Sequence, residues 1–222
     1  MKTIEAIEFD ARVRDAEILS EDRFGPKVYR TADGRMIKLF RIKRLFSTAR
    51  LIPYARRFER AAEELKARGI HTVEVIECLR VKGRARDAVV YRPVLGGTLR
   101  DSIAGNADEI LIRFSKFFAS LHALGVYFRA AHFANFIVEP GGGFAMIDIS
   151  EAHFSRGALR LAWRVRNFRH LARHEPDRAS LEAFGVARFC ETYLEASRLD
   201  DATRARFKRA VAAVHPIFGG LS

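Results

Sequence analysis

The sequence predicts an α+β fold in which a mainly β part is followed by a mainly helical part. Alternating apolar segments dominate before residue 92, and long amphipathic segments dominate after residue 98. Between them, Arg92-Pro93-Val94-Leu95-Gly96-Gly97 interrupts all regular structure. We therefore expect two unequal lobes with a cleft between them. Residues 1–94 would form a five-stranded antiparallel sheet with one helix, and residues 95–222 a mainly helical lobe.

Composition excludes several classes of protein. The 222 residues are 49% hydrophobic and 30% charged, which is typical of a folded globular chain. No apolar stretch has the length of a membrane span, and acidic residues from Glu5 onward argue against a secretory signal. Cys78 and Cys190 lie alone in apolar surroundings, which predicts buried, reduced thiols in a cytoplasmic protein. The formal charge of +12 indicates an anionic partner: nucleic acid, anionic lipid or a phosphorylated glycolipid.

Three strands are predicted in the first 41 residues. The first has Ala16, Ile18 and Phe24 as inward positions, and the turn at Gly25-Pro26 follows it. The second and third strands cover 27–31 and 36–41, and a hairpin turn joins them. Lys38 lies in the third strand. The commonest fate of such a lysine is a solvated position on an edge strand.

A basic stretch and a helix come next. Arg41 to Arg57 is rich in arginine and lysine and is either a solvated linker or a basic amphipathic patch that meets anionic lipid. Apolar residues recur at helical spacing over 54–68, and Gly69 ends this helix. Glu59 and Glu63 lie one turn apart on one side of it, where surface exposure is the ordinary expectation.

The remaining elements complete the two lobes. Strands are predicted at 73–79 and 88–91, and the interruption at 92–97 follows. A short helix can begin at Thr98 or Asp101, and a strongly amphipathic helix covers 108–124, where Gly125 ends it. Three further helices are predicted at the end of the chain, over 158–173, 181–196 and 201–214.

A hairpin follows Gly125. Phe136 to Val138 and Phe144 to Ile147 favour β-structure, and a proline and three glycines separate them. Asn135 precedes the first strand and Asp148 ends the second. An amide and a carboxylate brought together in this way can hold a hard cation such as Mg2+, which often shares its oxygen ligands with substrate phosphates. The alternative is an ordinary hairpin with an incidental Asn and Asp.

The spacing around this hairpin resembles that of the protein-kinase-like fold. Phe128-Arg129-Ala130 precedes Asn135 at the offset at which kinases carry His-Arg-Asp, and Asp148-Ile149-Ser150 stands where they carry Asp-Phe-Gly. The wider resemblance covers roughly residues 16 to 175. It is closest to the Kdo/heptose kinases of the lipopolysaccharide inner core, in particular to the subgroup called toluene tolerance proteins. The stretches that carry it are Gly25-Pro26-Lys27-Val28, Lys38-Leu39-Phe40, Tyr127-Phe128-Arg129, His132-Phe133-Ala134-Asn135 and Arg166-Asn167-Phe168-Arg169-His170.

This resemblance implies cofactors, residue roles and partners. It implies ATP and Mg2+, with Lys38 on the nucleotide phosphates, Glu59 or Glu63 paired with that lysine, and Asn135 and Asp148 on the metal. The acceptor would be a sugar hydroxyl of the lipopolysaccharide core or another anionic glycolipid. The protein would be cytoplasmic and peripheral at the inner face of the inner membrane, in contact with an anionic membrane surface. No specific nucleic acid is expected, because no recognised motif accompanies the charge.

Ala130 is the main departure from the family pattern. It occupies the position of the catalytic aspartate and can neither orient nor deprotonate an acceptor hydroxyl. General-base assistance contributes about 100- to 10,000-fold, so transfer driven by metal and positioning can survive its loss. We expect His132, with Arg129 beside it, to take the catalytic role, and the alternative for His132 is a structural bond to backbone near Asp148. The alternative function is a pseudokinase that binds nucleotide or glycolipid as a scaffold or regulator in envelope biogenesis.

Overall fold

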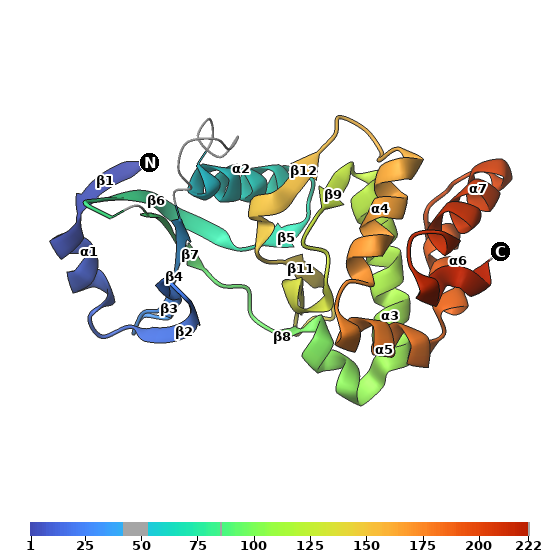
Figure 1. The fold of residues 1–222 in the computed structure, drawn as a ribbon, viewed down its shortest axis with the longest axis horizontal. Coiled ribbons are helices and arrows are strands. Elements are labelled where there is room, and N and C mark those ends of the chain that lie inside the picture. The colour runs from blue at the N-terminus through green and yellow to red at the C-terminus, as the bar shows by residue number, and fades with distance from the viewer. Residues whose placement is uncertain (42–52, 85, 222) are drawn as a thin grey trace. The chain divides into compact units, whose positions relative to one another are not determined.

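The computed structural model describes residues 1–41, 53–84 and 86–221 (Figure 1). The fold is α+β, as predicted. The chain divides into two compact units, which we call the first and second units. The first comprises Met1–Val94 with Asp148–Ser150, and the second Leu95–Ile147 with Glu151–Ser222. Most of the basic stretch after Arg41 lies outside the described residues. Within them, we find no helix with the length and apolar character needed to cross a membrane.

A six-stranded mixed sheet forms the first unit, where five antiparallel strands were predicted. Its spatial order is β1-β6-β7-β4-β3-β2, in which β1 is parallel to β6 and all other neighbours are antiparallel. The strands are β1 (Lys2–Glu5), β2 (Glu17–Asp22), β3 (Gly25–Arg30), β4 (Met36–Arg41), β6 (Glu74–Lys82) and β7 (Arg86–Arg92). The short strand β5 (His71–Thr72) also belongs to this stretch of chain. The order places β4 in the interior of the sheet.

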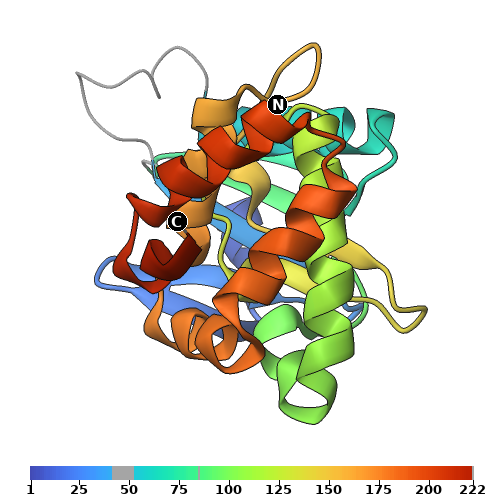
Figure 2. The same cartoon turned by 90° about the vertical axis from the view of Figure 1, so that its right-hand side faces the viewer.

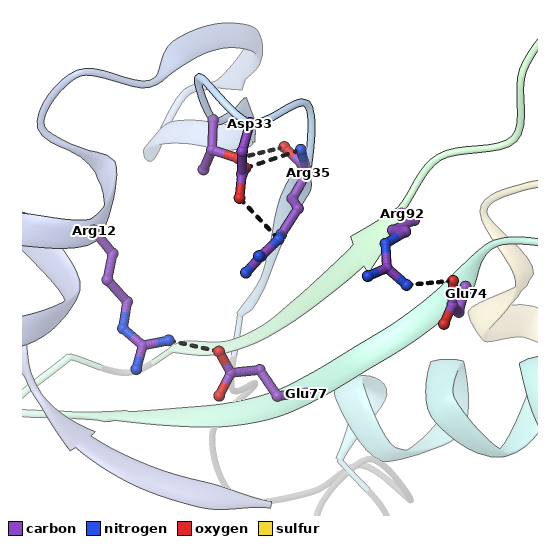
Figure 3. A network of polar contacts seen from close by, with 7 residues as sticks. Arg12, Asp33, Arg35, Glu74, Glu77 and Arg92 are labelled. Carbon is purple, nitrogen blue, oxygen red and sulfur yellow. Dashed lines mark hydrogen bonds and ion pairs between the residues drawn. The ribbon is translucent and has the colours of Figure 1, made fainter.

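Helix α1 (Ala6–Val13) was not predicted. It has no side-chain cap at its N-terminus and is only eight residues long, so the usual signals of a helix start are missing. Phe9 anchors it, because its buried ring contacts the edge of the Tyr29 ring in the core of the sheet. An ion pair of 2.6 Å between Arg12 and Glu77 joins the helix to β6, and a second pair joins Arg92 to Glu74 across β7 and β6 (Figure 3).

Of the three predicted inward positions of the first strand, Ala16 is partly buried against the core of the sheet, whereas Ile18 and Phe24 are not. Every residue of β2 is exposed, including Ile18 at 47%, and Phe24 just after it is 42% exposed. β2 is the last strand of the sheet, and its pairing with β3 shifts register twice, between Ile18 and Ser20 and between Ser20 and Glu21. Such irregularities are typical of sheet edges and break the alternation of inward and outward side chains.

Helix α2 (Tyr54–Ala67) matches the predicted helix and buries the expected face. Ala55, Phe58, Ala61, Ala62 and Leu65 are all buried. The Phe58 ring packs against Phe40 of β4 and Tyr91 of β7, with ring centroids 5.9 and 5.5 Å apart. The helix ends where predicted, since Gly69 takes a left-handed conformation with φ of +70°.

The second unit contains the predicted hairpin and three further short strands, β8, β9 and β12. β10 (Phe136–Val138) pairs antiparallel with β11 (Phe144–Met146) and, on its other side, with β8 (Gly97–Thr98). β9 (Val126–Phe128) pairs with β12 (Ala152–Phe154), which was not predicted. These pairings hold both ends of the segment that runs from residue 129 to residue 151.

The described residues of the second unit form five α-helices (Figure 2). They are α3 (Leu99–Ala123), α4 (Leu161–Leu171), α5 (Glu175–Phe184), α6 (Val186–Ala196) and α7 (Asp201–Ala212). Buried aromatic rings of α3, α4 and α6 pack on one another. α3 joins the short helix predicted near Thr98 to the long one, with non-helical geometry at Asn106. The single helix predicted over 181–196 is instead two helices, because Gly185 has φ of +96° and interrupts the ladder.

Candidate functional site

Lys38 is a buried lysine paired with a carboxylate. It lies in the interior strand β4 and is 7% exposed, so the expectation of a solvated edge-strand lysine is wrong. Its Nζ lies 2.6 Å from Oδ1 of Asp148, a residue that belongs to the same unit and lies 110 positions later in the chain. An ammonium group that loses hydration on burial needs such a partner. The first unit therefore brings together two of the residues expected to hold phosphate and metal.

Asp148 has an uncommon backbone conformation. Its φ is +53°, in the left-handed region that few residues other than glycine enter. Asp tolerates this region better than most side chains, at a cost of about 1–2 kcal/mol. The Ile147 N–H, one residue earlier, donates to the Asn135 carbonyl over 3.0 Å and fixes where β11 ends. The turn at Asp148 then directs its carboxylate towards Lys38. The Asp148 side chain is 40% exposed.

Glu59 and Glu63 do not form the expected pair with Lys38. Glu59 accepts from Arg56 over 2.6 Å, and among the described residues the recorded ion-pair partner of Lys38 is Asp148. Both glutamates line a pocket of about 450 Å³ between α2 and the chain that follows it. Glu59 also lies beside Cys78, where burial, and secondarily this carboxylate, raises the pKa of the thiol to about 12. Cys78 and Cys190 are both buried free thiols, as predicted.

Asn135 lies in a tight turn of the second unit and is held from within it. The turn is a 3-10 segment, Phe133–Asn135, and Asn135 is 7% exposed. Its Nδ2 donates to the Ala130 carbonyl and to Nε2 of His132, each over 2.9 Å. Both contacts use the amide nitrogen, so the Oδ1 atom of Asn135 is the atom of this side chain that can ligate a cation.

His132 positions Asn135. Since its Nε2 accepts a hydrogen bond from the amide, the lone pair that a general base would use is already engaged. The imidazole ring packs against His174, with centroids 4.6 Å apart. Arg129 is exposed, and its recorded hydrogen bond is a backbone one of 3.5 Å to the Glu151 carbonyl. Neither observation assigns these residues to catalysis, and their predicted role stays a prediction.

Two buried side chains that the sequence did not single out hold the segment around Ala130. Asp177 of α5 is fully buried, and its two oxygens accept from the Phe133 N–H over 2.9 Å and from Nε of Arg100 over 2.8 Å. Asn167 of α4 accepts from the Phe128 N–H over 3.2 Å and donates to the Phe128 carbonyl over 2.6 Å. No local pattern reveals them, because their partners lie 39 to 77 positions away.

His122 completes the support of Asn167. Its Nε2 lies 3.1 Å from Oδ1 of Asn167, and its Nδ1 lies 2.7 Å from the Tyr193 hydroxyl. Burial, and secondarily the charge of Arg164, lowers the pKa of His122 to about 3. The imidazole is therefore neutral at physiological pH. The Nε2–H then donates to Asn167 and Nδ1 accepts from Tyr193, an assignment that follows from these partners.

The donor chemistry fits a hard divalent cation that shares its ligands with phosphate. Asp148 offers a carboxylate and Asn135 an amide oxygen, the ligand types that Mg2+ prefers. In the described part of the chain, no three His, Cys, Asp or Glu side chains gather as a metal cluster. An ion held by the Asp148 carboxylate would thus take further ligands from water and phosphate oxygens, as is usual for Mg2+ in nucleotide sites. Searches with this sequence found no matching protein-family model and no matching curated protein.

Proposed function

We propose that this protein is an atypical phosphotransferase of the kinase-like fold, which uses ATP and Mg2+ to phosphorylate a sugar hydroxyl of the lipopolysaccharide inner core. The observation that carries the proposal is the ion pair between buried Lys38 and Asp148. A desolvated lysine and a carboxylate on a strained turn are the two groups that a nucleotide site needs, one for phosphate and one for metal. The predicted two-lobed arrangement, with nucleotide between the lobes, is part of the same proposal.

Each residue has a distinct task in this proposal. The Lys38 ammonium would exchange its carboxylate partner for phosphate oxygens, while Asp148 and Asn135 would hold Mg2+. When bound, the metal ion supplies neutralisation of the charge on the phosphates. His132 and the Ala130 carbonyl fix the Asn135 amide, so its oxygen needs no reorganisation. With alanine at position 130, catalysis would depend on positioning and electrostatics rather than on a carboxylate base.

A pseudokinase is the second candidate, and specific observations favour it. Ala130 offers no acidic side chain, and Nε2 of His132 is engaged with Asn135. Among the described residues, Lys38 also has no recorded ion pair with a glutamate of α2. Such a protein would bind nucleotide without transfer and act as a scaffold or regulator in envelope biogenesis.

One experiment separates the candidates. The protein is incubated with labelled ATP, Mg2+ and delipidated core oligosaccharide, alongside Asp148→Ala and the exposed hairpin variant Asp33→Ala. Transfer by the wild type and Asp33→Ala, but not by Asp148→Ala, supports the phosphotransferase. The pseudokinase is supported if no transfer occurs and Mg-ATP raises the melting temperature of the wild type but not that of Asp148→Ala. Neither transfer nor stabilisation would refute both.

A further inference from the structure

One face of α4 carries a tryptophan followed by arginines. Trp163, Arg166 and Arg169 recur three residues apart, a spacing that places side chains on one side of a helix, and Arg173 follows in the turn after α4. All four are exposed, and Trp163 is 42% exposed. Its ring contacts the buried Tyr127 ring edge-on with centroids 4.4 Å apart, so the exposed indole stands on a fixed support. The Arg166 guanidinium lies 5.8 Å from the indole centroid.

Among the described residues, the arginines around this face form no ion pair with an acidic side chain. Elsewhere in the second unit, Arg113 and Arg188 each form an ion pair with a carboxylate. Within the described ranges, no such pair is recorded for the exposed arginines that surround Trp163 and Tyr127. These are Arg129, Arg160, Arg166, Arg169 and Arg173. Unneutralised cations at close quarters repel one another, which costs stability unless an anion binds there.

The charges of four of these arginines act on His170. His170, on the same helix, accepts or donates a hydrogen bond of 2.8 Å with the Tyr127 hydroxyl. Burial, and secondarily the charges of Arg166, Arg173, Arg129 and Arg169, lowers the pKa of His170 to about 4. Four cations therefore act on one imidazole. Of the acidic side chains, Glu151 acts on the neighbouring Tyr127 hydroxyl, where its charge contributes to a raised pKa after burial, the main cause.

An apolar hollow adjoins the cations. A pocket of about 450 Å³ is lined by Tyr127, Leu159, Arg160 and Trp163 together with residues of β12 and of the loop before α4. Leu124, 41% exposed, precedes Gly125, whose carbonyl accepts from the Ser155 N–H in the pocket wall over 2.9 Å. Exposed apolar side chains thus lie beside the exposed arginines on one part of the second unit.

We propose that this face, comprising Trp163, Arg129, Arg160, Arg166, Arg169 and Arg173, docks on a bilayer that contains anionic phospholipids. The arginines would contact headgroup phosphates, and Trp163 would lie at the boundary between headgroups and acyl chains, where amphipathic aromatic rings are favoured. This role does not depend on phosphoryl transfer. A single-stranded nucleic acid fits less well, because successive bases stack on several exposed aromatic rings. Among the described residues of α4, Trp163 is the one exposed aromatic side chain.

The chain's only tryptophan reports on this contact directly. The protein is mixed either with phosphatidylcholine vesicles that contain about 30–40% phosphatidylglycerol or with vesicles of phosphatidylcholine alone. Tryptophan fluorescence and sedimentation with the vesicles are then measured. We expect a blue shift and quenching by brominated acyl chains with the anionic vesicles only, and release by high salt, since screening shortens the electrostatic reach.

Matched charge variants test the surface. Arg166→Gln/Arg169→Gln should weaken partitioning about 30-fold, from the usual contribution of a basic residue at an anionic surface. Arg206→Gln/Arg209→Gln removes two exposed arginines at the same spacing on α7 and should change it by less than about threefold. The Trp163→Phe variant should still sediment with anionic vesicles, because its arginines are unchanged.

Several results would overturn the proposal. They are equal binding to neutral vesicles, equal loss in the two arginine pairs, or sedimentation without any change in Trp163 fluorescence. Tighter binding of a single-stranded RNA oligomer than of anionic vesicles, with loss in Arg166→Gln/Arg169→Gln, would assign the face to nucleic acid instead. None of these results bears on phosphoryl transfer, so failure here and failure of the phosphotransferase are distinguishable.

Discussion

Replacing Asp177 with alanine should destabilise the protein and release the segment that carries Asn135. The carboxylate is fully buried and accepts from the Phe133 N–H and from Arg100. Its removal leaves a buried N–H without an acceptor, which costs about 1–3 kcal/mol. Arg100 is one-third exposed and can regain water, so the lost ion pair adds only about 1 kcal/mol. We expect a loss of about 2–4 kcal/mol in the free energy of unfolding.

Urea unfolding monitored by circular dichroism measures this loss, and thermal unfolding should show a decrease of about 5–15 °C in Tm for a chain of this size. Asp108→Ala is the matched control. It breaks an ion pair with Arg188 in which both side chains are about half or more exposed, and should cost less than about 1 kcal/mol. Asp177→Asn, which keeps an acceptor for Phe133, should fall between them. If Asp177→Ala loses no more stability than Asp108→Ala, the buried anchor has been misjudged.

Three further predictions follow from buried groups and tight turns. The pKa of His122 is lowered to about 3, mainly by burial, so the unfolded chain takes up this proton first as pH falls below about 6.5. Stability should decline from pH 6.5 towards pH 3, by up to about 5 kcal/mol, and His122→Gln should flatten that decline in urea titrations at several pH values. Gly125→Ala should cost several times more than Gly34→Ala in Tm. Both glycines have positive φ, but a Cβ at Gly125 would lie 2.5 Å from the Gly157 carbonyl oxygen, whereas the space at Gly34 is open. Burial raises the pKa of Cys78 and Cys190 to about 12, so neither should react with a thiol reagent at pH 8 until urea unfolds the chain, and rapid labelling of the native protein would contradict their burial.

Local periodicity predicts the long elements of this fold well. Helix α2 and the long part of α3 have apolar residues at helical spacing, and both occur where expected. The hairpin of β10 and β11 follows equally from its glycine turn. In each case the signal and the structure concern the same short stretch of chain.

Elements that depend on distant partners escape such prediction. β1 gains its order from parallel pairing with β6, whose residues lie more than seventy positions later. Lys38 is buried because β4 lies between β3 and β7, and a strand's neighbours are set by long-range pairing. The exposure of Ile18 has the same origin, since β2 is an edge strand with shifted register.

The candidate site divides along similar lines. The hairpin pattern indicates Asn135 and Asp148 as oxygen ligands, and the family resemblance adds Lys38. Neither reveals that Lys38 and Asp148 are ion-paired, nor that Asp177 and Asn167 hold the intervening segment, because these contacts join residues 39 to 110 positions apart. The opposite holds for Glu59 and Glu63 of α2. Both are acidic residues on the helix where a partner for Lys38 was expected, yet among the described residues neither forms an ion pair with it.

We propose that Lys38 and Asp148 form the phosphate and metal part of a nucleotide site, and the melting temperature with and without Mg-ATP is the most direct test of this proposal. At a ligand concentration about 100 times Kd, binding to the folded state adds about 2.7 kcal/mol, or roughly 5–11 °C in Tm. We predict that this rise occurs in the wild type, needs Mg2+, and disappears in Lys38→Met and Asp148→Asn. It should persist in Lys82→Met, which breaks an exposed lysine–glutamate pair of the same unit. Stabilisation that is absent from the wild type, or unchanged in Lys38→Met, would contradict the claim.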